Sequence, residues 1–300
     1  MNLYKSLIFI LYLGIFLGSG FRTPAQSRDS ITLYGTLDTV QVIRQRIQHA
    51  NEANAGARVT HISPAILQAN KTRSLAELLT DHTSIYIKSL GTGALSTASF
   101  RGTSASQTRV NWNGINITPP LSGTFDFSQI PVFFTDNINL YYGSSHVKNG
   151  TGAIGGSVNL FTDTDWNRGV NGRVLAEYGS YNTYTVGGQA NISGNKSASK
   201  TRLYYQHSDN DYTYLNKVLT NIPFREKRQD AAYSQFGIMQ EGYFRVSPYT
   251  RLTAVAWYQK NHRNLPQPLG VVNRSQEDQE ENNFRGYAGL DFSRGIHELH

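Results

Sequence analysis

The hydrophobic residues of this chain follow two different patterns. Between residues 29 and 165 they come in short runs separated by glycine and turn residues, whereas beyond residue 171 they alternate with polar residues. The alternation is clearest at residues 184–192 and 284–292, where one parity is apolar or small and the other is mainly polar. A period of two is typical of β-strands that have one apolar face. The later part of the chain is therefore expected to consist of strands.

The alternating segments have the length of membrane-spanning strands. Less regular strands are expected at four further places, residues 173–178, 201–208, 235–246 and 251–259. Runs of about 8 to 12 residues suit the tilted strands of an outer-membrane barrel. The link at 247–250 is short, whereas 209–232 and 260–282 are expected to be long polar loops, and this asymmetry is also typical of such barrels. A soluble β-sandwich remains the alternative, because it alternates as well.

The earlier part carries the helical signals. Ser74 and Glu77 have the spacing of a capping box, in which the Ser hydroxyl accepts from the Glu amide and the carboxylate accepts from the Ser amide. Leu75, Leu78 and Leu79 then share one helical face, and a second short helix is expected to start at Pro64. Extended segments are expected at 85–89, 109–112, 115–117, 138–142 and 157–161, with a hairpin turn at 113–114. The earlier part thus reads as a compact α+β domain.

The N-terminus has the pattern of a signal peptide. Lys5 precedes an apolar run at residues 7–17, and the small-residue pattern at 25–27 follows. A run of about 11 residues is shorter than the roughly 20 that a membrane-spanning helix needs. We expect residues 1–27 to be removed on export, followed by an N-terminal segment at 28–57, the α+β domain at 58–165 and the strands at 166–300.

Composition excludes several classes of protein. The chain has no cysteine, so disulfides and thiolate metal sites are impossible. Its mean hydropathy of −0.42 disfavours a bundle of transmembrane helices. The net charge of +7 comes without a basic cluster beyond residues 225–228, so nucleic-acid binding is not indicated.

The motifs that suggest catalysis or cofactor binding are either incomplete or lack the secondary structure that they require. Residues 150–155 match a dinucleotide-binding glycine pattern, but an expected strand follows where that fold needs a helix. Fragments of a serine acylase signature at 193–196 and 208–210 lack the rest of the motif. The eight histidines show no metal-ligand spacing. We therefore expect no enzyme, no metal and no cofactor.

An ordered series of short motifs is more informative. It comprises LDTVQV at 37–42, SLAELL at 74–79, IYIK at 85–88, FRG at 100–102, VNWNGI at 110–115, FSQIP at 127–131, INLYYG at 138–143 and GTGAIGGSVNLF at 150–161. In order and spacing, this series resembles the plug domain of TonB-dependent outer-membrane receptors. Asn139 and Tyr142 stand where that family usually has an acid and an arginine. The resemblance implies an α+β plug followed by antiparallel transmembrane β-barrel strands, in the Gram-negative outer membrane.

The resemblance also implies a partner and a contact. TonB, with its inner-membrane energising complex, is expected to grip the segment formed by Asp38, Thr39, Val40, Gln41 and Val42. An extended, β-branched segment can add a strand to a partner's sheet, although an internal edge strand of the plug is the plainer interpretation. Arg101 is expected to hold the plug against acidic residues of the barrel, with an ordinary surface ion pair as the alternative.

The ligand expected from the resemblance is a bulky nutrient taken up actively. The pattern from Trp112 to Pro131 looks most like that of cobalamin (vitamin B12) receptors, with an iron–siderophore receptor as the alternative. Two apex loops rich in small and hydroxyl residues are nominated for ligand contact, through Leu95, Ser96, Thr97, Thr118, Pro119, Pro120, Leu121 and Ser122. A surface lipoprotein is a further possible partner. A secreted β-sandwich enzyme or a surface adhesin is the alternative of another class.

Barrel arithmetic adds one expectation. Barrels that hold a plug have about 22 strands, whereas this sequence supplies about six. We expect the chain to be a fragment of a longer barrel protein.

Overall fold

The computed structural model of the chain describes residues 58–143, 153–218, 222–269, 276–294 and 297–299. Asn51–His300 fall in one compact unit. Among the described residues, no helix has both the length and the apolar character needed to span a membrane. The segments predicted to be a signal peptide and a TonB-binding segment lie outside the described residues.

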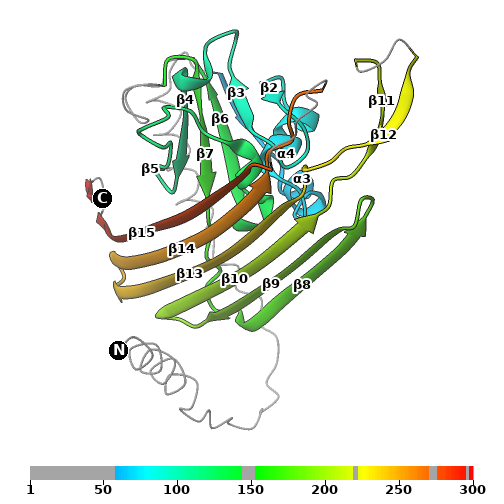
Figure 1. The fold of residues 1–300 in the computed structure, drawn as a ribbon. Helices are drawn as coiled ribbons and strands as arrows, with labels where there is room; N and C mark the ends of the chain where they lie inside the picture. Colours follow the sequence, from blue (N-terminus) through cyan, green and yellow to red (C-terminus); the bar gives the residue numbers. More distant parts are fainter. Residues whose placement is uncertain (1–57, 144–152, 219–221, 270–275, 295–296, 300) are drawn as a thin grey trace, which may run out of the picture. The chain divides into compact units, whose positions relative to one another are not determined.

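A five-stranded sheet organises the α+β domain (Figure 1). Its strands, in spatial order, are β1 (Arg58–His61), β6 (Asn137–Tyr142), β7 (Gly156–Phe161), β4 (Thr108–Trp112) and β5 (Ile115–Asn116). β4 and β7 run parallel, and the other pairs are antiparallel. The expected hairpin joins β4 to β5, with Asn113 at φ 48° and Gly114 at φ 86°. Positive φ at both positions is what the short Asn-Gly turn supplies.

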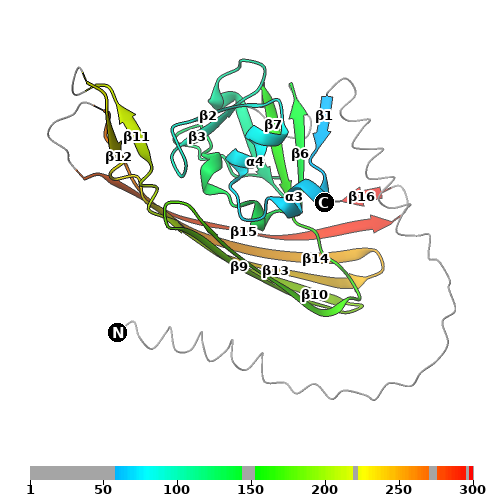
Figure 2. The same ribbon diagram turned by 90° about the vertical axis from the view of Figure 1, so that its right-hand side faces the viewer.

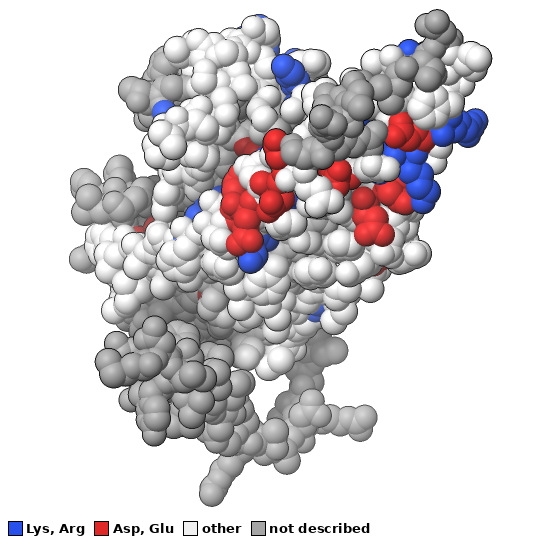
Figure 3. All heavy atoms as spheres, viewed as in Figure 1, with Lys and Arg blue, Asp and Glu red and all other residues white. Residues whose placement is uncertain are grey.

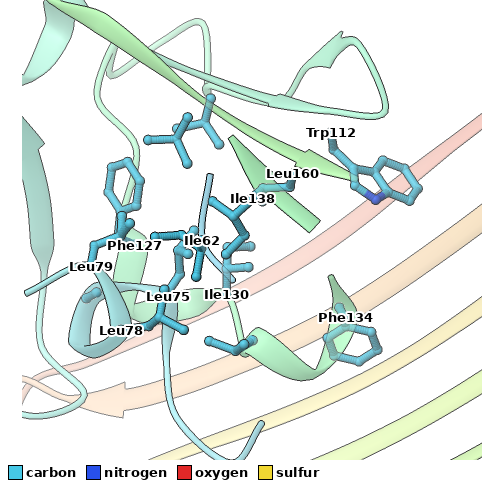
Figure 4. Close-up of a cluster of buried hydrophobic side chains, with 14 of the residues drawn as sticks. Ile62, Leu75, Leu78, Leu79, Trp112, Phe127, Ile130, Phe134, Ile138 and Leu160 are labelled. Atoms are coloured by element: carbon cyan, nitrogen blue, oxygen red, sulfur yellow. The ribbon is translucent and has the colours of Figure 1, made fainter. Parts of the chain in front are cut away.

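The helices form where the capping signals predicted them. α3 (Pro64–Ala69) is capped by Ser63, and α4 (Leu75–His82) by the box in which the Ser74 amide donates to Glu77 Oε2 at 2.8 Å. The three leucines of α4 are fully buried and pack in one apolar cluster with residues of β6, β7 and the short 3₁₀ helix η2 (Phe127–Gln129) (Figure 4). A small hairpin of β2 (Tyr86–Ser89) and β3 (Ser96–Ser99) and the 3₁₀ helices η1 (Ala105–Gln107) and η3 (Val132–Phe134) complete the domain.

A curved antiparallel sheet follows the domain (Figure 2). Along the chain its strands are β8 (Gly169–Gly179), β9 (Thr183–Ser193), β10 (Ser197–Ser208), β13 (Tyr233–Ser247), β14 (Thr250–Asn264), β15 (Asp278–Arg294) and β16 (His297–Leu299). Each pairs with its neighbour in chain order, from β8 at one edge to β16 at the other. The short turns at 194–196 and 248–249 lie at the opposite end of the strands from the longer connections.

The prediction of two long loops is wrong in detail. Residues 209–232 contain a hairpin of β11 (Thr213–Asn216) and β12 (Phe224–Lys227). β14 and β15 extend to the pair Asn264–Asp278, which shortens the second loop to residues 265–277. The reason is that polar cross-strand pairs continue the ladder without any hydrophobic alternation. Arg263 donates to Gln279, for example, and Lys260 lies 3.0 Å from Glu280.

Candidate functional site

The large sheet has apolar residues on its exposed face, whereas its buried face carries many polar and charged residues among aromatic ones. On β13, Phe236 and Ile238 are 39% and 38% exposed, whereas Gln235 and Glu241 are 6% and 0% exposed. The same exposed apolar character recurs on the neighbouring strands, at Val170, Val174, Tyr178, Val186, Ile192, Leu203, Leu252, Phe284 and Leu290. Figure 3 shows a broad area of this face with few charged residues, and charges gathered in one central patch and toward β11 and β12. A water-soluble sandwich has the reverse distribution.

The buried face packs against the α+β domain through a group of charged residues. Asp136 accepts from Arg202 and lies 3.1 Å from Lys200 Nζ, both on β10. Arg202 is fully buried and also lies 3.4 Å from Glu241 of β13. Burial by itself would raise the pKa of Asp136, but Arg202 and Lys200 outweigh it and hold that pKa well below its usual range. Asp136 is therefore charged at any physiological pH.

Lys71 completes this charged group from the side of the domain. Its Nζ donates to the carbonyl oxygens of Thr135 at 2.5 Å and Val132 at 3.4 Å. Burial lowers the pKa of Lys71 to about 8, against the opposing attraction of Asp136. Asp126 forms a second ion pair across the interface, 2.7 Å from Arg263 Nη1 of β14. In both pairs the acid belongs to the domain and the base to the sheet.

Side chains of the sheet also donate hydrogen bonds to backbone carbonyl oxygens of the domain. The Tyr204 hydroxyl donates to Thr72 at 3.0 Å, and Gln235 Nε2 donates to Ser128 at 2.8 Å. Further bonds of this kind come from Arg202, Gln206, Asn210 and Gln259. The sheet thus holds the domain largely through donors to its main chain.

Aromatic rings add an apolar contact between the two regions. Phe134 lies 5.2 Å from Trp257 of β14, and Trp112 lies 5.1 Å from the same ring. Figure 4 shows Trp112 and Phe134 on the side of the apolar cluster that lies next to the strands of the sheet. Gly237 makes room for Phe134, because a Cβ at that position would lie 2.6 Å from the ring.

The comparisons with known proteins agree with this architecture. The model of the TonB-dependent Receptor Plug Domain matches residues 51–157. Residues 51–157 are a TonB-dependent receptor plug domain. We therefore call residues 58–161 the plug and the large sheet the wall. The α+β plug followed by antiparallel strands, expected from the sequence, is confirmed.

A relative and two solved structures show further similarity, and the fold that the solved structures share extends beyond the plug. The vitamin B12 transporter BtuB of Photobacterium profundum is 32% identical over 135 residues, which cover 45% of this chain and 22% of that protein. The ferripyoverdine receptor of Pseudomonas aeruginosa has a TM-score of 0.60 at 16% identity, covering 78% of this chain and 32% of the receptor. The siderophore receptor PiuA of Acinetobacter baumannii has a TM-score of 0.59 at 18% identity, covering 81% and 35%. The chain thus spans about a fifth of its curated relative.

The structure brings one of the two nominated apex loops to the wall. A cavity of about 200 Å³ lies between the plug and strands β10 and β13. Gly91, Thr92, Gly93 and Ser96 line it from the plug, together with residues of α4. Leu95 is partly exposed, and Thr97 is half-buried. The sequence did not indicate the wall residues of this cavity, among them Tyr233.

The second apex loop lies away from this cavity. Pro119, Pro120, Leu121 and Ser122 are exposed, Leu121 completely. Two nominated side chains are held inside the plug, because Ser96 Oγ donates to Ser89 at 3.0 Å and Thr118 Oγ1 accepts from the Val110 amide at 3.2 Å..

The Arg101 assignment stays a prediction. Arg101 is exposed, at φ 50°, and its guanidinium lies 6.0 Å from the ring of Tyr142 in the plug itself. The ion pairs described between plug and wall have the opposite polarity to the one expected for it, with acids on the plug. Asn139, which stands where the family usually has an acid, is hydrogen-bonded through its Oδ1 to His61 Nδ1 at 2.7 Å. Among the described residues, no group of three histidine or acidic side chains could hold a metal ion.

Proposed function

We propose that this protein is a TonB-dependent outer-membrane receptor that takes up a bulky nutrient actively. The observation that carries the proposal is the reversed polarity of the wall, which exposes apolar residues and packs polar ones against a plug. Such a wall suits a bilayer on its outer face and a polar lumen on its inner face. Residues 1–27 act in this proposal as the cleaved signal peptide.

The interface between plug and wall suits a plug that must move. Each of its hydrogen bonds contributes about 0.5–1.5 kcal/mol net, and water can replace a lost partner when the plug shifts. The charged group around Asp136 resists separation more strongly, because a buried charge that loses its partner is destabilised by about 3–5 kcal/mol. The ligand needs only to bias the plug toward the state that exposes its TonB segment.

The periplasmic partner in this proposal is TonB, with its inner-membrane energising complex. TonB pulls on the segment from Asp38 to Val42 by pairing with its backbone. Replacing Val40 with proline removes a backbone donor and restricts the strand, so uptake of labelled ligand by cells should fall to background. Full-rate uptake at normal protein levels would show that the segment is not gripped.

Cobalamin is the ligand we favour. The support is the Trp112–Pro131 pattern and the 32% identity to the vitamin B12 transporter. An iron–siderophore complex is the second candidate, because solved siderophore receptors share the fold. Calorimetry of the full-length protein should give heat with cyanocobalamin and none with a ferric siderophore. The reverse result would assign the second candidate.

Proteins of another class fit less well. A secreted β-sandwich enzyme would bury its apolar residues between sheets, contrary to the exposed positions of Phe236 and Ile238. A surface adhesin could share the architecture, and accumulation of labelled cyanocobalamin inside cells would exclude it. The proposal involves no covalent chemistry. A surface lipoprotein partner stays a prediction from the resemblance in sequence.

A further inference from the structure

One level of the wall carries a continuous row of polar side chains. Strand register places its members directly opposite one another on β9, β10, β13, β14 and β15. We call them the amide row: Thr185, Gln206, Gln235, Asn261 and Glu281. The row lies toward the end of the strands where the longer connections start. Facing residues in such a ladder have Cβ atoms about 4.5–5.5 Å apart, so neighbouring amides lie side by side.

Most polar atoms of the row have partners in the plug, in the row itself or on β15. Gln206 Nε2 donates to Thr185 Oγ1 at 3.0 Å and to the carbonyl oxygen of Thr72. Gln235 Nε2 donates to the carbonyl oxygen of Ser128 at 2.8 Å. Glu281 accepts from Gln279 at 2.5 Å.

Three atoms of the row have no partner among the described residues. They are Gln235 Oε1 and both polar atoms of Asn261, Oδ1 and Nδ2. Gln235 is 6% exposed and Asn261 is 7% exposed. A buried polar group without a hydrogen bond lowers the stability of the fold by about 1–3 kcal/mol. Three such atoms on two residues that face each other across β13 and β14 therefore indicate a missing partner.

Two cavities meet at Gln235. The smaller, of about 10 Å³, is lined by both Gln235 and Asn261 and has room for a single water molecule. The larger, of about 200 Å³, is the one beside the apex loop. Gly93, Tyr233 and Gln235 line both cavities. Gly93 lies so close to the Tyr233 ring that a Cβ there would be 2.2 Å away.

The unpaired atoms define the chemistry of their partner. They offer two acceptors and one NH₂ donor. A primary amide is complementary, because its NH₂ can donate to Gln235 Oε1 and Asn261 Oδ1 while its oxygen accepts from Asn261 Nδ2. A carboxylate has no hydrogen to donate, and an ammonium group has no acceptor. Arg263 is already paired with Asp126, and Glu281, which lines the same cavity, disfavours an anion, so a neutral group is favoured.

We propose that Gln235 and Asn261 bind a primary amide carried on one arm of the ligand, which enters through the larger cavity past Tyr233. The inference rests on the proposed function and deepens it. Cobalamin fits this chemistry, because primary amides project from the rim of its corrin ring. A single water molecule is the alternative occupant, since the smaller cavity has room for one.

The test is calorimetry of the full-length protein with cyanocobalamin. Asn261→Leu removes the donor and one acceptor at nearly constant volume, and affinity should fall at least tenfold, about the loss of one to two hydrogen bonds. Asn261→Ala should give a similar loss and guards against a steric effect of leucine. The matched control is Asn282→Leu on the outer face of β15, where affinity should stay within twofold. Thermal unfolding of each variant checks that it is folded.

A ligand-side change identifies the contact itself. A cobalamin monocarboxylic acid, in which the bound amide is replaced by a carboxylate, should bind the wild type at least tenfold more weakly. The same change of ligand should cost less affinity in Asn261→Leu, where only the bond to Gln235 is left to lose. Equal affinity of wild type and Asn261→Leu for cyanocobalamin would overturn the inference and leave water as the only occupant. If the wild type gave no heat with cyanocobalamin, the proposed ligand and this inference would both fall.

Discussion

The plug and the wall differ in which side chains they bury. The plug buries its leucines and phenylalanines around α4, as a water-soluble domain does. The wall instead buries Arg202, Glu241 and Gln235 and exposes apolar residues such as Leu203. The comparison shows that the polarity of the side chains on each face of the sheet matches what that face contacts. An apolar outer face is stable next to lipid, and a polar inner face is stable against the plug's carbonyl groups and charges.

The strongest test of the comparison removes a buried charge from the wall. Arg202→Met leaves Asp136 and Glu241 without their main counter-charge, so we expect a destabilisation of about 3–5 kcal/mol. Unfolding by denaturant in detergent micelles measures the change. Arg225→Met, at an exposed position on β12, is the control and should have little effect. A mild effect of Arg202→Met would mean that the interface is well hydrated.

The same substitution in the two regions gives the next largest effect. Leu78→Ala in the plug removes a fully buried side chain and should cost about 3 kcal/mol through lost burial and a cavity. Leu203→Ala on the outer face of the wall should change stability by only about 0.5 kcal/mol, because the residue is 46% exposed. Equal losses at the two positions, measured by the same unfolding experiment, would contradict the reversed polarity.

The smallest effect concerns pH. Because the folded pKa of Lys71 is lowered to about 8 from 10.5, the unfolded chain binds more protons between these values, and stability should rise with pH there. The gain between pH 8 and 9 is about 1 kcal/mol. Thermal unfolding across this range should show the rise in the wild type and lose it in Lys71→Met. An unchanged rise in the variant would assign it to other groups.

Local signals made much of the plug predictable. The capping box of Ser74 and Glu77 and the Asn113–Gly114 turn each depend on residues within three positions, and both appear as expected. The wall strands followed from alternation, but their polar extensions did not, because a ladder of paired polar residues has no hydrophobic period. The β11–β12 hairpin was missed for the same reason.

The interface could not be found in this way. Asp136 and Arg202 are 66 positions apart, and their contact depends on how the plug packs on the wall. The contact expected from the sequence was instead a basic plug residue, Arg101, facing an acidic wall. Similarly, no local pattern showed that the hydroxyl groups of Ser96 and Thr118 form hydrogen bonds within the plug. Their role as ligand contacts stays a prediction.

The order of motifs along the chain was enough to determine an α+β plug followed by antiparallel strands, because capping, turns and alternation act between near neighbours. Only the tertiary structure decided which polar side chains meet across the interface and which are left without a partner. Strand register aligns Gln235 with Asn261 across 26 positions of sequence, and no local pattern encodes that register.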